Sequence, residues 1–288
     1  MWADVTDADY VCSTDNQFTV RATGGVDFQT GAAALRVNGN TAWHAGNDGS
    51  GSTLDADLLD GQHGGAFQQK YGNVVVVAKS GGDYTSIQAA LTDITGVSDT
   101  NRYLVWVAPG IYTETVTMKQ YVDIEGAGEL LTTISSGGAA GTVTGANNAE
   151  LRFLTVRNTG GVSAAVAIFN NFASPWLTHV TATASGGTNS YGVYNAASSP
   201  TIQNSTVRAS GGTNSYGIYN SASGGLHTVK VNNCQVTGST NTIRNDTEFT
   251  VRIGASQLDG GAVTGGGTVT CAGIYDEAYT FYASTCPP

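Results

Sequence analysis

Apolar and polar residues alternate over short stretches of the chain, and this alternation returns at nearly regular intervals through its later part. Four stretches, starting at residues 151, 177, 202 and 231, align so that three mostly apolar columns appear. The columns are Leu151, Leu177, Ile202 and Val231; Leu154, Val180, Ser205 and Cys234; and Val156, Ala182, Val207 and Val236. Because alternate residues of a strand face opposite sides, each stretch is predicted to be a short strand with one buried face.

The clearest repeat is a stretch of twelve residues that begins at Ala184 and returns at Ala209 with one change, Val193 to Ile218. A period of about 25 residues is typical of a parallel β-helix, in which each coil stacks on the next. Leucine-rich repeats have a similar period, but their Leu-x-x-Leu-x-Leu pattern is absent. Other parallel sheets need crossover helices, and no helical periodicity follows Ile94. The pattern therefore predicts an all-β solenoid.

A second set of aligned strands predicts ladders of like residues along this solenoid. Strand parity points one column inward, Ile168, Val193 and Ile218, together with an asparagine column at the strand ends, Asn170, Asn195 and Asn220. The asparagines are predicted to form a structural ladder of hydrogen bonds. Parity points Phe169, Tyr194 and Tyr219 outward. This aromatic row could contact another subunit, line a glycan groove, or stack within its own coils.

The stretch from Val74 to Gly161 predicts how the solenoid begins. A buried strand is followed by a glycine turn and a short helix with Asp83 at its N-cap, whose apolar residues are Ile87, Ala90, Leu91 and Ile94. Strands follow on both sides of Pro109-Gly110 and at residues 121–128. This order resembles the opening of the β-helices of the pectin methylesterase and pectate lyase superfamily. The resemblance implies a right-handed parallel β-helix whose N-terminal end is covered by the helix.

The N-terminal segment, residues 1–70, has a different character. One strand is predicted around Phe18, with a turn at Gly24-Gly25, and residues 54–62 could form one short helical turn. The runs Trp43–Gly49 and Leu54–Gly61 resemble a segment of phage tail-fibre and tail-spike proteins. That resemblance implies an elongated, usually trimeric attachment protein. The aspartates Asp55, Asp57 and Asp60 are weak calcium candidates, since they lack EF-hand spacing, and otherwise cap a helix and a turn.

Four segments are therefore predicted. They are residues 1–70, for attachment or oligomerisation; 71–128, with the capping helix and first coils; 129–270, the β-helix coils; and 271–288, a C-terminal β cap.

Composition narrows the classes of function. The net charge is −10, and no cluster of Lys and Arg offsets it, so binding to nucleic acid is not expected. The sequence contains no run of eighteen apolar residues, so no membrane insertion is expected, and residues 1–30 lack the pattern of a signal peptide. We expect a protein that is extracellular, on a cell surface or on a virion. The missing signal peptide would then mean export by another route, release by cell lysis, or a sequence numbered from a mature or trimmed start.

The cysteines agree with an oxidising environment. Cys271 and Cys286 bracket an alternating C-terminal stretch, and a disulfide between them is predicted, with two free thiols on a frayed tail as the alternative. Cys234 falls in an apolar column and is predicted to be a buried, inert thiol. Cys12 is left over, and no pair has the C-x-x-C spacing of a zinc or redox site.

Acid–base chemistry has few candidate residues. Enzymes of the resembled superfamily use acidic groups on their middle coils, but Glu150 is the single carboxylate between Leu130 and Asn245, and the methylesterase acid motifs are absent. Asp123 and Glu125, which share one face of a strand, are the best catalytic pair available. His179, in a column with Phe153, Asn204 and Asn233, and His227, after a Gly-Gly turn, are read as turn or surface residues.

The sequence thus predicts a non-enzymatic fibre protein, a rigid rod that mediates assembly and attachment and needs no cofactor. Its expected partners are further copies of itself, as a trimer or a filament, and a cell-surface glycan. A subunit of a polymeric extracellular filament is one alternative, and a polysaccharide lyase, hydrolase or esterase is the second. The tyrosine-rich C-terminal stretch would cap the solenoid or add a strand to a partner.

Overall fold

The computed structural model describes residues 71–221 and 224–287 and, nearer the N-terminus, the backbone of four two-residue strands. The chain divides into two compact units, Met1–Gln68 and Gln69–Pro288. Within the described parts, no helix has the length and apolar character that crossing a bilayer requires.

In the first unit, β1 (Arg36–Val37) pairs antiparallel with β2 (Asn40–Thr41), and β3 (Leu58–Leu59) pairs antiparallel with β4 (Gln62–His63). The helical turn predicted over residues 54–62 is wrong, because Asp60-Gly61 between β3 and β4 is a dipeptide that favours hairpins. Several predicted features lie outside the described residues. They are the strand around Phe18, the tail-fibre-like segment, Cys12, and the candidate ligands Asp55, Asp57 and Asp60.

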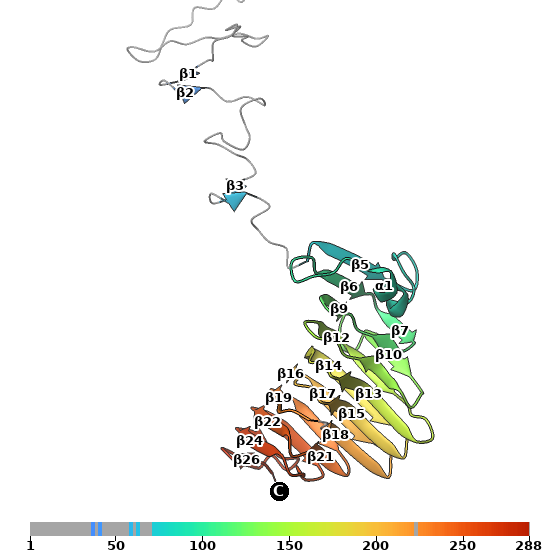
Figure 1. The fold of residues 1–288 in the computed structure, drawn as a ribbon, viewed down its shortest axis with the longest axis vertical. Coiled ribbons are helices and arrows are strands. Elements are labelled where there is room, and N and C mark those ends of the chain that lie inside the picture. Colours follow the sequence, from blue (N-terminus) through green and yellow to red (C-terminus); the bar gives the residue numbers. More distant parts are fainter. Residues whose placement is uncertain are drawn as a thin grey trace, which may run out of the picture. The chain divides into compact units, whose positions relative to one another are not determined.

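The second unit is a right-handed parallel β-helix, as the sequence predicts, and its strands stack coil upon coil (Figure 1). Three rows of strands form its faces, which we call the first, second and third face in chain order. The first face contains β5 (Asn73–Val77), β6 (Tyr103–Val107), β9 (Val122–Gly126), β16 (Thr201–Gln203), β19 (His227–Asn232), β22 (Phe249–Gly254), β24 (Thr268–Ala272) and the first halves of β12 (Glu150–Asn158) and β14 (Trp176–Ser185).

The second face begins in the later halves of β12 and β14. Its other strands are β7 (Gly110–Thr113), β10 (Thr132–Ser136), β17 (Thr206–Ser210), β20 (Gln235–Gly238), β23 (Gln257–Gly260) and β25 (Ile274–Tyr275), with β26 (Phe281–Tyr282) antiparallel to β25. The third face is a separate six-stranded sheet. It contains β8 (Val116–Thr117), β11 (Gly141–Thr144), β13 (Ala164–Asn171), β15 (Asn189–Ala196), β18 (Asn214–Ser221) and β21 (Asn241–Asn245).

The predicted columns are part of the core. Ile168 pairs with Val193, Val193 with Ile218 and Ile218 with Ile243, each partner lying one coil further along the chain. All four side chains are buried, as are the three apolar columns of the first and second faces. Each coil therefore buries its apolar residues against the same residues of its neighbours.

The bend between the first and second faces depends on one residue per coil. Phe153, His179, Asn204, Asn233 and Ala255 all have φ between 44° and 53°. This left-handed backbone is uncommon for residues other than glycine, and asparagine adopts it most readily. One such residue turns the strand sharply, so β12 and β14 continue from one face to the next. The predicted turn role of the His179 column is therefore confirmed.

The N-terminal helix α1 (Ile87–Asp93) packs on β5, β6 and β8. Its N-cap is Ser86, whose Oγ accepts from the backbone N–H of Ala89 (3.2 Å), so the prediction of Asp83 as N-cap is wrong. Asp83 instead accepts from the Val76 N–H at 2.8 Å and closes the preceding turn. Glu114 completes the cap, since its carboxylate accepts from the first backbone N–H groups of the helix.

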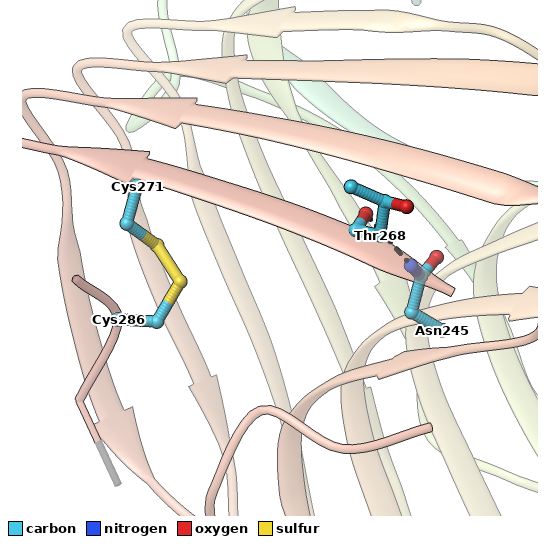
Figure 2. Close-up of a disulfide and its surroundings, with 4 residues drawn as sticks. All are labelled: Asn245, Thr268, Cys271 and Cys286. Atoms are coloured by element: carbon cyan, nitrogen blue, oxygen red, sulfur yellow. Dashed lines mark hydrogen bonds between the residues drawn. A yellow bond between two sulfur atoms is a disulfide. The ribbon is translucent and has the colours of Figure 1, made fainter. Parts of the chain in front are cut away.

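At the other end, the last coil is fastened by a disulfide between Cys271 and Cys286, whose Cα atoms are 5.2 Å apart (Figure 2). Ile274 and Cys271 are buried in the core, and β26 folds back on β25. The C-terminal segment thus packs against its own solenoid.

The predicted asparagines are buried and form a ladder. Asn170 Nδ2 donates to Asn195 Oδ1 (2.8 Å), Asn195 to Asn220 (2.7 Å), and Asn220 to Asn245 (3.1 Å). The structure extends the ladder to Asn245, which donates to the carbonyls of Phe249 and Thr268, the latter drawn in Figure 2. The ladder therefore joins four successive coils at the end of the third face.

Asn195→Ala should destabilise the solenoid by about 2–5 kcal/mol, because it leaves Asn170 Nδ2 and Asn220 Oδ1 buried without their partners. Urea unfolding followed by circular dichroism measures this. The matched control is Asn171→Ala at the neighbouring exposed position, which should change stability by less than about 0.5 kcal/mol. Equal effects of the two substitutions would contradict the role of the ladder.

Removing the disulfide by Cys271→Ala with Cys286→Ala should cost about 3 kcal/mol, since the bond closes a loop of 15 residues. Thermal unfolding with and without a reducing agent gives the test. The reducing agent should lower the melting temperature of the wild type and leave that of the double variant unchanged. A wild type that is insensitive to complete reduction would contradict the prediction.

Candidate functional site

The predicted acidic pair lies where the first coils meet. Asp123 and Glu125 are on β9 and point away from the core, because Ile124 between them is buried inside. Strand register places Arg152 of β12 beside Glu125. Glu150 begins the same strand, and Arg102 immediately precedes β6. Polar side chains from consecutive coils are thereby brought onto one patch of the first face.

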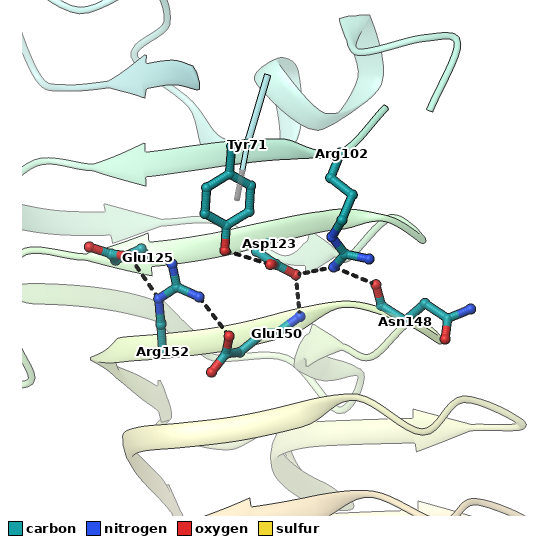
Figure 3. A network of polar contacts seen from close by, with 7 residues as sticks. All are labelled: Tyr71, Arg102, Asp123, Glu125, Asn148, Glu150 and Arg152. Carbon is teal, nitrogen blue, oxygen red and sulfur yellow. Dashed lines mark hydrogen bonds and ion pairs between the residues drawn. The ribbon is translucent and has the colours of Figure 1, made fainter. Parts of the chain in front are cut away.

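Asp123 is completely buried although it faces outward. Its Oδ2 accepts from the Tyr71 hydroxyl at 2.6 Å, and its Oδ1 accepts from Arg102 Nη2 at 3.0 Å and from the Glu150 backbone N–H at 2.8 Å (Figure 3). A carboxylate buried in this way is stabilised by its donors and by the charge of the arginine. Asp123 therefore links Tyr71, which precedes the first strand β5, with the three successive coils that contain β6, β9 and β12.

Arg152 lies between the two glutamates (Figure 3). Its Nε donates to Glu125 Oε2 at 2.7 Å, its Nη2 forms an ion pair with the same oxygen at 2.6 Å, and its Nη1 donates to Glu150 Oε2 at 2.6 Å. Its guanidinium carbon is 5.6 Å from the centre of the Tyr71 ring. Burial acts to lower the pKa of Arg152, but the hydrogen bond to Glu125 and the neighbouring groups outweigh it, so the pKa is raised overall. The cation is thus permanently held between two carboxylates.

This network limits what the acids can do chemically. A general acid or base needs an oxygen that can reach a substrate proton and exchange it. Asp123 and Glu125 share a face as predicted, but each carboxylate is bound to a different arginine. Side-chain exposure is 1% for Asp123 and 27% for Glu125. The ion pairs join one coil to the next. Within the described parts of the chain, His, Cys, Asp and Glu residues form no cluster that could hold a metal ion.

An open pocket of about 430 Å³ adjoins this network. It is lined by Asp99, Arg102, Tyr121, Asp123, Asn148, Ala149, Glu150 and Trp176. Trp176 is not among the predicted site residues, although its neighbour Leu177 belongs to an inward column and strand parity therefore points Trp176 outward. Tyr121 and Asn148 could not be placed, because both have a left-handed backbone, with φ of 63° and 54°.

The predicted aromatic row is part of a larger cluster on the third face. We call Phe169, Tyr191, Tyr194, Tyr216 and Tyr219 the aromatic cluster. Ring centres lie 5.1 Å apart for Tyr194 and Tyr219 and 5.2 Å apart for Phe169 and Tyr194, and Tyr191 stacks on Tyr216 at 5.5 Å. All five side chains are half-buried. The rings therefore cover one another in part and still present an aromatic surface.

Tyr191 and Tyr216 were missed because the strand alternation is interrupted. Gly192 and Val193 are both buried in succession, so Tyr191 and Tyr194 point to the same side. A Cβ added at Gly192 would lie 2.6 Å from a methyl group of Val207 and 2.7 Å from the Gly217 carbonyl oxygen. Glycine inside a strand often marks such an irregularity. The glycine in the order Tyr-Gly-Val-Tyr was therefore the sequence signal that the two tyrosines could lie on the same side.

The remaining candidates occupy structural positions. Cys234 is buried and without a disulfide partner, and burial raises its thiol pKa to about 11, which keeps it un-ionised at neutral pH. His179 stacks on Phe153, with ring centres 4.9 Å apart, at the bend between faces. A polar groove of about 590 Å³ runs along this bend, lined in part by Glu129, His179 and Gln235. His227 is the first residue of β19, not part of a turn, and its ring lies 5.0 Å from that of Phe249, its register partner on β22.

Alkaline titration should report the aromatic cluster. Burial, followed by the charges of neighbouring tyrosines, raises the pKa of Tyr191 to about 12. Since an unfolded tyrosine has a pKa near 10, this group stabilises the fold fully below about pH 10, and that contribution is lost as pH rises through about 12. Tyr191→Phe should remove this loss. This alkaline loss of stability is measured from unfolding midpoints between roughly pH 9 and 12, and the ionisation itself from tyrosinate absorbance.

The exposed Tyr279 is the control for this titration, and Tyr279→Phe should leave the alkaline loss of stability in place. An identical pH dependence in Tyr191→Phe and the wild type would contradict the prediction.

Comparisons with known proteins give structural likeness alone. No family model matches the chain, and no curated protein matches it in sequence. Similar solved structures include pectin methylesterase PemA from Erwinia chrysanthemi, which is 12% identical, with 74% of this chain and 91% of that chain covered and a TM-score of 0.46. Pectin methylesterase from carrot is 17% identical, with 73% of each chain covered and a TM-score of 0.44. Pectate lyase Pel9A is 15% identical, with 68% of this chain and 55% of that chain covered and a TM-score of 0.48. Likeness at this level carries no argument about chemistry, and the assignment of the β-helix depends on the strand pairing described above.

Proposed function

We propose that this chain is a non-enzymatic structural and adhesive subunit of an extracellular fibre, on a virion tail or a cell surface. The observation that carries the proposal is that the carboxylates best placed to act as a catalytic pair are engaged in ion pairs. Asp123, Glu125 and Glu150 are bound to Arg102 and Arg152 in contacts between coils. The side chains that polysaccharide chemistry would need are thus engaged in holding the solenoid together.

The construction of the solenoid suits a stiff rod. The asparagine ladder, the stacked apolar columns and the Asp123 network each join one coil to the next. In a solenoid, each coil contacts its neighbours alone, so stability accumulates along the axis without a larger core. Charged residues are 12% of the chain, which leaves few surface groups that titrate with pH. Such a rod would keep its shape in varied surroundings.

An extracellular location is part of the proposal. The disulfide between Cys271 and Cys286 forms in oxidising compartments. The likeness of residues 43–61 to tail-fibre segments, noted from the sequence, points the same way.

Self-association is proposed to use the aromatic cluster. Its five half-buried rings form an apolar patch on the third face, and patches of this kind commonly mark contacts between proteins. Tyrosine is enriched at such contacts because its ring packs while its hydroxyl remains able to bond. The expected assembly is a trimer in which this face is covered by another copy.

Light scattering coupled to gel filtration tests the assembly. The wild type should elute as a discrete trimer, and Tyr194→Ser with Tyr219→Ser should release monomers of unchanged secondary structure. Tyr279→Ser, at an exposed tyrosine outside the aromatic cluster, is the control and should remain trimeric. Open-ended growth would favour the filament instead, and a monomeric wild type would contradict the proposal.

An activity assay tests the absence of catalysis. Polygalacturonate, its methyl ester and a panel of other polysaccharides should give no products above background. Turnover that disappears in Glu125→Gln while the melting temperature is unchanged would contradict the proposal. The melting temperature is needed because Glu125 holds Arg152, so lost activity alone could reflect a loosened coil.

A further inference from the structure

The pocket beside the Asp123 network has the composition of a ligand site. Its lining combines two aromatic residues, Trp176 and Tyr121, with the polar side chains of Asp99, Arg102 and Asn148. Its volume of about 430 Å³ lies in the range of pockets that hold small molecules. The lining residues come from successive coils, so the pocket exists because the coils are stacked.

Trp176, the larger aromatic residue of the pocket lining, is open to solvent. Trp176 is 60% exposed although it is the first residue of a core strand. Its backbone is fixed, since its N–H donates to the Ala149 carbonyl (3.0 Å) and the next residue, Leu177, is buried. The indole is therefore presented on a fixed backbone, beside the polar groups of the same pocket, where its face is open to a ligand. Tyr121 forms part of the same lining, 5.9 Å from the Arg102 guanidinium carbon.

The polar groups are held by a second layer of contacts. Arg102 Nη2 donates to Asp123 and to the backbone carbonyl of Asn148, both at 3.0 Å, which fixes the guanidinium. Arg152 holds Glu150 in the same way at 2.6 Å. The side chains of Asp99 and Asn148 are exposed at the rim. Groups held in place before a ligand arrives lose little entropy on binding, which favours affinity.

We propose that this pocket binds one neutral hexopyranose unit of a surface glycan, an inference that rests on the attachment role proposed above. A pyranose has an apolar C–H face, which stacks on an indole ring, and a rim of hydroxyls, which bond to carboxylate, amide and guanidinium groups. Among the described residues, the lining holds three carboxylates and one arginine. Asp123 pairs with that arginine and Glu150 pairs with Arg152, so the negative charge that remains in the lining is that of Asp99 at the rim. This excess of negative charge disfavours uronic and sialic acids. A neutral sugar is therefore the fitting ligand.

Binding of the full chain to a printed array of neutral, uronic and sialylated oligosaccharides tests the proposal. The wild type should bind neutral members, and titration with the best of them should show Trp176→Ala weakening the affinity about 30-fold, as loss of an aromatic anchor does. Phe172→Ala is the matched control, because Phe172 is a similarly exposed aromatic residue in the connection that precedes β14, and it does not line the pocket. It should bind like the wild type. Asp99→Ala, at the exposed rim, should weaken binding without affecting the fold.

The outcomes separate this site from the attachment role as a whole. Glycan binding that survives in both Trp176→Ala and Asp99→Ala would overturn the pocket while leaving attachment standing. A weaker affinity of Tyr194→Ser for the free sugar, titrated in solution where avidity plays no part, would move the site to the aromatic cluster. Preference for anionic sugars would also overturn the proposal. A wild type that forms trimers but binds no sugar on the array would overturn both the pocket and the adhesive half of the proposed function.

Discussion

The fold depends on one constraint, the in-register stacking of each coil on the coil before it. Backbone hydrogen bonds set this register, and the buried asparagines reinforce it, since Asn195 and Asn220 each accept from the asparagine of the preceding coil and donate to that of the next. A slip of one residue would remove every such pair and turn the apolar columns outward. Both ends of the stack have added covers, the helix α1 at the start and the disulfide-linked segment at the finish.

The surface features follow from how each coil turns. Left-handed residues between the first and second faces bend the strand within a single residue and leave a polar groove outside. On the third face, two successive buried residues bring Tyr191 and Tyr194 to the same side, so two columns of rings merge into one patch. On the first coils, Tyr71 and the two arginines cover carboxylates that parity alone would leave exposed. The polar groove and the aromatic cluster are therefore consequences of backbone irregularities repeated from coil to coil, whereas the Asp123 network is built from side chains of the first coils.

The sequence predicted the solenoid because its period and columns are properties of neighbouring coils. Strand parity placed the inward columns, such as the one that contains Val193. The positions of Cys271 and Cys286 on either side of the alternating C-terminal stretch predicted their disulfide. Parity failed where the backbone departs from a regular strand, which is why Tyr191 and Tyr121 were not assigned. The N-cap was misplaced because Asp83 is used in a turn, and the cap is completed by Glu114, which lies far from Ile87 in the sequence. The burial of Asp123 could not be foreseen, since its partners come from three other segments.

The proposal with the widest consequences is that the solenoid of residues 69–288 is a rod whose third face is covered by another copy of the chain. Electron cryomicroscopy of the native assembly tests it most directly. Solenoids packed side by side through Tyr194 and Tyr219, with strands about 4.8 Å apart along the rod axis, are the expected result. A native particle that contains single chains, with the aromatic cluster open to solvent or occupied by a bound polysaccharide, would contradict it.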